Sequence, residues 1–162
     1  MRVAVIADTH MPRGRRRLPG SCVERLRAAD LILHAGDIVT ADVLAELEAL
    51  GPPVHAVHGN MDEPALQKRL PATLVAKVGG LRIGMTHDAG PRVGREERLA
   101  RRFPGCAAVV YGHTHQPQLE RVGEVWILNP GSPTERRRAP AHTMLVLDVT
   151  VGRLEPALVE VS

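Results

Sequence analysis

Large aromatic residues and cysteines are scarce in this sequence of 162 residues. Trp126, Tyr111 and Phe103 are the only large aromatic side chains. Single-stranded nucleic acids are usually bound through aromatic stacking platforms, so this scarcity disfavours that class of protein. The two cysteines, Cys22 and Cys106, lie far apart and lack zinc-site spacing, so a structural zinc site built on thiolates is not expected. We expect both to be buried thiols in a reducing compartment.

Long hydrophobic runs are also missing. No apolar run reaches the roughly 18 residues that cross a membrane as a helix. The chain starts directly with a β-prone run at 2–7, without the basic segment and apolar stretch of a signal peptide. We therefore expect a cytoplasmic protein with no membrane partner. A length of 162 residues and a hydrophobic content of 44% suit one domain, residues 1–162, with a sizeable core.

Positive charge is in slight excess and comes almost entirely from arginine. The net charge is +3, and Lys68 and Lys77 are the only lysines. A basic protein attracts polyanions, so nucleic acid is an alternative partner, which the scarcity of aromatic residues disfavours. We interpret the charge as consistent with an anionic substrate.

Apolar β-prone runs alternate with helix-like segments in the first half of the chain and dominate the second half. We expect helices over 21–29, 41–50, 63–70 and 93–102, with Thr40 as one N-cap and Ser21 in a capping box with Glu24. Alternating strands and helices imply parallel pairing and right-handed crossovers. The expected fold class is α/β, with two packed sheets and helices outside. The expected strands are 2–7, 31–34, 54–57, 73–78, 81–85, 107–111, 118–122, 125–128, 143–149 and 153–159.

Five short polar fragments follow five of these apolar runs. They are Asp8-Thr9-His10, Gly36-Asp37, Gly59-Asn60, Thr86-His87 and Gly112-His113-Thr114-His115. Each fragment alone is equally typical of a turn, a helix cap or an exposed loop. Ligands in open α/β sheets gather outside the carboxyl ends of the strands, and all five fragments lie at such ends. We therefore expect their side chains to meet in space.

The side chains of these fragments are suited to holding two divalent cations. Residues two apart in an extended segment point to the same side, which pairs Asp8 with His10 and His113 with His115. A carboxylate has two oxygens, so Asp37 can bridge two ions. Paired cations about 3.5–4 Å apart are used to hydrolyse phosphate esters. The mixture of oxygen and nitrogen ligands favours Mn²⁺, Fe²⁺, Co²⁺, Ni²⁺ or Zn²⁺ over Mg²⁺ or Ca²⁺.

The ordered set of fragments resembles the calcineurin-like metallophosphoesterase superfamily. With the segment Asn129-Pro130-Gly131-Ser132, the chain looks most like the small bacterial and archaeal phosphodiesterase branch. The resemblance implies a four-layer α/β/β/α sandwich of two mostly mixed sheets, and two metal ions, with Mn²⁺ as the first expectation. The first ion would be held by Asp8, His10, Asp37 and His115. The second would be held by Asp37, Asn60, His87 and His113.

The expected activity is hydrolysis of a small phosphodiester, with in-line attack on phosphorus by a hydroxide that bridges the two cations. One departure from the family pattern concerns the leaving group. Much of the family has a histidine after the Gly-Asn pair that helps to protonate the leaving group, and this chain has Met61 there. Asn60 and Arg13 are the expected substrate contacts, because guanidinium groups pair with phosphate oxygens and Arg13 is close in sequence to the metal fragments.

Two other functions remain open at this point. The chain could be a protein-binding scaffold on the same fold, as in the retromer subunit that this branch also resembles, but a scaffold has no need for seven ligand side chains. It could also be a nuclease, which the basic charge favours and the lack of aromatic residues disfavours. Related small enzymes often pair, so a homodimer or higher oligomer is an open expectation.

Overall fold

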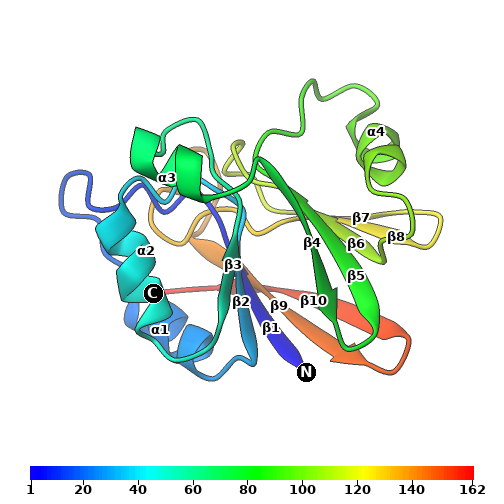
Figure 1. The fold of residues 1–162 in the computed structure, drawn as a ribbon, viewed down its shortest axis with the longest axis horizontal. Helices are drawn as coiled ribbons and strands as arrows, with labels where there is room; N and C mark the ends of the chain where they lie inside the picture. Colours follow the sequence, from blue (N-terminus) through cyan, green and yellow to red (C-terminus); the bar gives the residue numbers. More distant parts are fainter.

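Ten strands form two five-stranded sheets in the computed structural model, which describes residues 1–162 (Figure 1). The first sheet has the strand order β10-β9-β1-β2-β3, and the second has the order β4-β5-β6-β8-β7. Each sheet combines parallel and antiparallel pairs, as expected. The strands are β1 (Arg2–Ile6), β2 (Leu31–His34), β3 (Val54–Ala56), β4 (Thr73–Val78), β5 (Leu81–Thr86), β6 (Ala108–Val110), β7 (Gln118–Val122), β8 (Val125–Asn129), β9 (Thr143–Thr150) and β10 (Arg153–Glu160).

The two sheets pack face to face, and helices cover their outer faces (Figure 1). Strand β1 shows why this arrangement is stable, because both of its faces are apolar. Val3 and Val5 point into the core between the sheets, whereas Ala4 and Ile6 pack against the helical layer. The predicted four-layer α/β/β/α sandwich is therefore confirmed. Its helices are α1 (Gly20–Arg27), α2 (Ala41–Glu48), α3 (Pro64–Arg69) and α4 (Arg95–Arg102).

The helices are short and start close to the predicted positions. Thr40 caps α2 as predicted, since its side chain accepts a hydrogen bond from the backbone N–H of Val43 at 3.4 Å. The capping box predicted for Ser21 is wrong, because α1 already begins at Gly20. The Ser21 hydroxyl instead donates to the backbone oxygen of Ser162, which ties α1 to the end of the chain. None of the four helices is long and apolar enough to cross a lipid bilayer.

The parallel strands of both sheets end at one edge of the sandwich. Strands β1, β2 and β3 are parallel in the first sheet, and β5, β6 and β8 are parallel in the second. The loops that follow these strands carry all five polar fragments and the Asn129–Ser132 segment. The two sheets are joined at this edge by a hydrogen bond of 2.7 Å between His87 Nδ1 and the backbone oxygen of Ala35. The fold thus brings fragments far apart in sequence to one place.

Candidate metal centre

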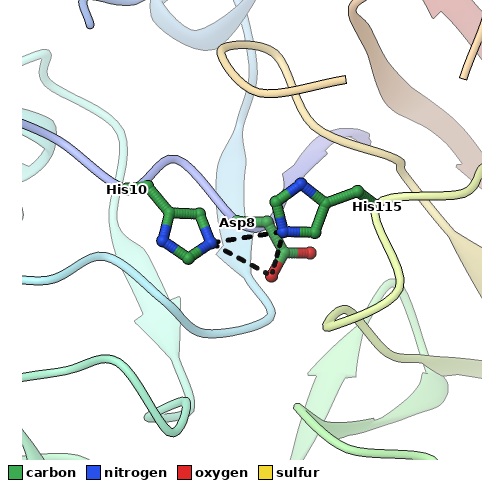
Figure 2. A group of neighbouring side chains, drawn as sticks. All are labelled: Asp8, His10 and His115. Atoms are coloured by element: carbon green, nitrogen blue, oxygen red, sulfur yellow. Dashed lines mark hydrogen bonds and ion pairs between the residues drawn. The ribbon is translucent and has the colours of Figure 1, made fainter. Parts of the chain in front are cut away.

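Asp8, His10 and His115 form one compact group at this edge (Figure 2). The two Nε2 atoms of His10 and His115 lie 3.2 Å apart. Asp8 Oδ1 lies 3.6 Å from His115 Nε2 and 3.9 Å from His10 Nε2. All three side chains are buried, although they come from loops more than 100 residues apart. The carboxylate oxygen and the two ring nitrogens therefore point at one small volume.

A second group adjoins the first and includes the remaining predicted residues. Asp37 Oδ2 lies 3.3 Å from His87 Nε2 and 3.4 Å from His10 Nε2, so this carboxylate faces both groups. Asn60 Oδ1 lies 3.1 Å from His87 Nε2 and 3.1 Å from His113 Nδ1. The structure thus brings all seven predicted side chains together.

The backbone that presents these side chains is not extended, contrary to the prediction. The backbone φ angle is positive at five of the seven residues: 55° at Asp8, 46° at His10, 59° at Asp37, 69° at His113 and 59° at His115. Non-glycine residues rarely adopt this left-handed region, and it costs about 1–2 kcal/mol per residue. Asp8 and His10 still converge through a tight left-handed turn, whereas His113 lies beside Asn60 and His115 lies beside His10. Such strain persists at functional sites when the surrounding structure imposes it.

Asp62 organises the loop around Asp37, a role that the sequence analysis did not identify. Its buried carboxylate accepts hydrogen bonds from the backbone N–H groups of Gly59 and Val39, each at 2.6 Å, and from that of Asp37 at 3.2 Å. The backbone N–H of Met61 in turn donates to Asp37 Oδ1 at 2.8 Å. A carboxylate two residues after the Gly-Asn pair was the available signal.

The segment that follows β8 supports the first group. The Ser132 hydroxyl donates to the backbone oxygen of Asp8 at 2.8 Å. Asn129 Nδ2 donates to the backbone oxygen of Gly112 at 3.1 Å, which fixes the loop that carries His113 and His115. The Asn129–Ser132 segment therefore holds together the loop that carries Asp8 and the loop that carries His113 and His115.

Charged side chains from the loops after β1 and β8 lie beside the first group. Glu135 Oε2 lies 3.8 Å from His10 Nε2, and Glu135 Oε1 pairs with Arg16 at 3.1 Å. Glu135 could not be singled out from the sequence because it lies in an irregular loop, whereas Arg16 belongs to the arginine cluster at 13 and 15–17, whose guanidinium groups are suited to pairing with phosphate oxygens. Arg13 is exposed, and its backbone N–H donates to the backbone oxygen of His10 at 3.0 Å. Its charge lies close enough to lower the pKa of His10, although burial has the larger effect.

His34 is a structural histidine at the end of a strand. The ring lies fully buried at the end of β2, where Nδ1 accepts from the backbone N–H of Gly36 at 3.2 Å and Nε2 lies 3.1 Å from Thr9 Oγ1. Burial lowers the pKa of His34 to about 3, so the ring stays neutral. His34 therefore supports the turns that carry Asp8 and Asp37 without entering the centre.

The pKa values of the clustered acidic and imidazole groups are shifted far from their ordinary values. Burial raises the pKa of Asp8 to about 8 and lowers that of His115 to about 4. Burial also lowers the pKa of His87, but its ion pairs with Asp37 and Asp8 outweigh this effect and raise it to about 9. In the metal-free protein, a proton therefore neutralises Asp8, and a second proton gives His87 the positive charge that pairs with Asp37.

Divalent cations fit this arrangement better than protons do. Asp8 Oδ1 lies within 3.9 Å of the facing Nε2 atoms of His10 and His115, and these two nitrogens compete for one proton. Neutral imidazoles and carboxylates are ordinary ligands of first-row divalent metals. A cation between them would bind Asp8 Oδ1 and both nitrogens at once.

Metal binding should therefore release protons and become tighter as the pH rises. Asp8 and His87 are protonated at pH 7 in the metal-free protein and must lose these protons to bind a cation. Between pH 6 and 8 we expect the affinity for Mn²⁺ or Zn²⁺ to rise about tenfold per pH unit for each proton displaced. Calorimetric titration in buffers of different ionisation enthalpy measures the protons released. An affinity independent of pH would contradict this account of the site.

Comparison with known proteins gives consistent results across nearly the whole chain. Residues 1–152 match the family model of the calcineurin-like phosphoesterase superfamily domain. A probable metallophosphoesterase of Methanothermobacter thermautotrophicus is 35% identical over 148 residues, which are 90% of this chain and 85% of the relative. A phosphodiesterase of Methanocaldococcus jannaschii is 25% identical over 144 residues, 81% of this chain and 83% of the relative. Wild-type Vps29 from Entamoeba histolytica, crystallised with Zn²⁺, has a TM-score of 0.78 and 26% identity, with 99% of both chains covered.

Proposed function

This chain belongs to the calcineurin-like phosphoesterase superfamily, and we propose that it is a phosphodiesterase that works with two divalent metal ions. The observation that carries the proposal is the convergence of seven metal-ligating side chains on one edge of the sandwich. The similarity to a phosphodiesterase of Methanocaldococcus jannaschii supports the choice of a diester over a monoester.

The geometry supports the division of ligands that the family resemblance implies. Asp8, His10 and His115 would hold the first ion, and Asn60, His87 and His113 the second. Asp37 Oδ2 lies within 3.4 Å of a ring nitrogen from each set, which supports its role as the bridging carboxylate. We propose Mn²⁺ as the metal, with Ni²⁺, Fe²⁺, Co²⁺ and Zn²⁺ as alternatives, since all of them accept mixed oxygen and nitrogen ligands.

When bound, the two ions would lower the pKa of water toward about 7 and neutralise charge on the phosphoryl oxygens. The protein's own groups would position the ester. Asn60 and His113 are exposed and face the solvent from which the substrate arrives. Arg13 and Arg137 lie near enough to affect the ionisation of His10, and we propose that Arg13 contacts a phosphate oxygen.

Two other functions make different predictions. A protein-binding scaffold is favoured by the structural similarity to Vps29. A scaffold, however, has no use for five ligand residues held in left-handed conformations that destabilise the fold. A nuclease would show binding to short RNA or DNA that weakens steeply with salt.

The test of the proposed function is metal analysis of the purified protein together with an assay on bis(p-nitrophenyl) phosphate. We expect about two equivalents of a transition metal per chain, hydrolysis that chelation abolishes, and recovery when Mn²⁺ is restored. Metal-replete protein that leaves the diester intact would favour the scaffold.

Met61 leads to a prediction about the leaving group. Methionine cannot donate a proton, so turnover should depend strongly on leaving-group pKa, with nitrophenyl esters cleaved faster than alkyl esters. We expect Met61→His to flatten this dependence and to accelerate the esters with the poorest leaving groups by about 10²-fold, the lower end of general-acid catalysis. The measurement is kcat/KM across a series of esters for both proteins. A wild-type rate that does not vary along the series would refute the claim that the lack of a proton donor at position 61 limits turnover.

A further inference from the structure

The candidate metal centre is unevenly exposed, and this defines the side from which substrate can enter. Asp8, His10 and His115 are 0%, 3% and 0% exposed, whereas Asn60 and His113 are exposed. The Glu135 side chain lies against the buried group, next to His10. Asn60 and His113 therefore mark the solvent-facing side of the second group.

A cleft of about 500 Å³ opens on that side and includes three of the candidate ligands, Asn60, His87 and His113. Its volume is in the range of small-molecule sites. Two larger clefts elsewhere include none of the seven candidate ligands. Most small-molecule sites are lined by apolar side chains, but only one of the ten residues lining this cleft is hydrophobic. The cleft therefore offers an occupant many hydrogen-bonding groups.

The polar groups of the cleft that the fold leaves unpaired are mainly hydrogen-bond acceptors. Gln67 donates through Nε2 to the backbone oxygen of Asp62, which leaves Oε1 available. Asp88 accepts from the backbone N–H of Gly90 through Oδ1, which leaves Oδ2 available. Nδ1 of His58 is buried without a partner. Arg102 is the cationic donor of the cleft.

This set of groups distinguishes between classes of ligand. An aromatic or acyl group would displace water from these polar groups without replacing its hydrogen bonds. A second anionic group would meet Asp88 beside Arg102, and the charge of the two cations would already be balanced by Asp8, Asp37, the bridging hydroxide and the phosphodiester itself. Hydroxyl groups both donate and accept, so they satisfy the acceptors of Gln67 and Asp88, the donors of Arg102 and either tautomer of His58.

We propose that this cleft binds the alcohol portion of the phosphodiester, and that this portion is polyhydroxylated, as in a ribose or a glycerol. The proposal rests on the proposed function, because the phosphate of the same molecule would lie at the metal centre. Arg102 and Asp88 are then specificity residues, which act on the alcohol and not on phosphorus.

The test compares esters that release the same leaving group. The p-nitrophenyl esters of a ribonucleoside 5′-phosphate and of glycerol phosphate are compared with p-nitrophenyl phenyl phosphate. We expect kcat/KM to favour the hydroxylated esters by about tenfold, equivalent to about 1.4 kcal/mol. The ratio between the ribosyl and glyceryl esters identifies which alcohol fits.

Two variants probe the cleft, and one controls for surface charge. Arg102→Met removes the donor, and Asp88→Asn keeps the Oδ1 acceptor for Gly90 while replacing the available acceptor with a donor. Each should lower kcat/KM for the preferred hydroxylated ester by about five- to tenfold and leave the phenyl ester within about twofold. Arg101→Met is the control, because Arg101 binds the backbone oxygen of Glu97 and lies outside the cleft.

A binding measurement separates failure of this proposal from failure of the proposed function. Calorimetric titration with ribose 5-phosphate, glycerol 1-phosphate and phenyl phosphate should show tighter binding of a hydroxylated phosphate, lost in Arg102→Met and kept in Arg101→Met. Selective binding without hydrolysis of any ester would overturn the phosphodiesterase and support the cleft. Hydrolysis in which Arg102→Met affects phenyl and hydroxylated esters equally would overturn the cleft and leave the phosphodiesterase standing.

Discussion

Asp37→Asn should lower phosphodiester hydrolysis by on the order of 10³-fold, the range seen when a group that stabilises transition-state charge is removed. The loss is expected because Asp37 Oδ2 faces both His10 and His87, so one neutral amide would weaken both metal positions. Asparagine retains the oxygen that accepts the backbone N–H of Met61, so the loop should keep its conformation. Metal content and kcat/KM, measured on the same preparation, check the prediction.

Asp42→Asn is a suitable control for this variant. Asp42 lies in the first turn of α2 and is exposed, outside the candidate metal centre. Its substitution should change stability by less than about 1 kcal/mol, through the helix dipole alone, and leave metal content unchanged. If Asp37→Asn kept two metals and full activity, the bridging role of Asp37 would be wrong.

Gly59→Ala should remove activity through backbone geometry without changing any charge. A Cβ atom at Gly59 would lie 2.1 Å from Asp37 Oδ1 and 2.5 Å from the Asp37 backbone nitrogen. Neither contact can be relieved by rotating a distant side chain, so Asp37 itself must move. We expect the metal-free protein to lose about 1–3 kcal/mol of stability, as for other overpacked sites. Urea unfolding measures the loss of stability, and metal analysis with the diester assay measures the loss of the active centre.

Gly20→Ala controls for the loss of glycine as such. Gly20 is the first residue of α1, and a Cβ atom there would meet no atom within 4 Å. This variant should unfold at the same or a higher urea concentration and keep its metals. Equal behaviour of the two alanine variants would show that the close approach of Gly59 to Asp37 has no functional importance.

The layers and the edge that carries the site followed from simple patterns in the sequence. Runs such as Val3–Ile6 are apolar on both faces, which is typical of a strand buried between a sheet and helices. The polar fragment after each run then has to lie at the carboxyl end of a strand. This reasoning placed Asp8 and His115 together although 107 positions separate them.

The local conformation and the supporting residues could not be derived in the same way. A left-handed φ at Asp8 or His113 could not be assigned from residue type, because Asp and His are only moderately enriched in that region and glycine is its usual marker. Glu135 reaches His10 only through the path of an irregular loop. Ser21 and Glu24 have the local spacing of a capping box, but the partner of the Ser21 hydroxyl is Ser162, which is distant in sequence.

The most direct measurement is a crystal structure of the protein grown with Mn²⁺, with anomalous difference maps from data on both sides of the manganese edge. The account predicts two peaks about 3.5–4 Å apart. One should lie among Asp8, His10 and His115, the other among Asn60, His87 and His113, and both should contact Asp37. A map without peaks at these side chains, or with a single ion away from Asp37, would contradict it.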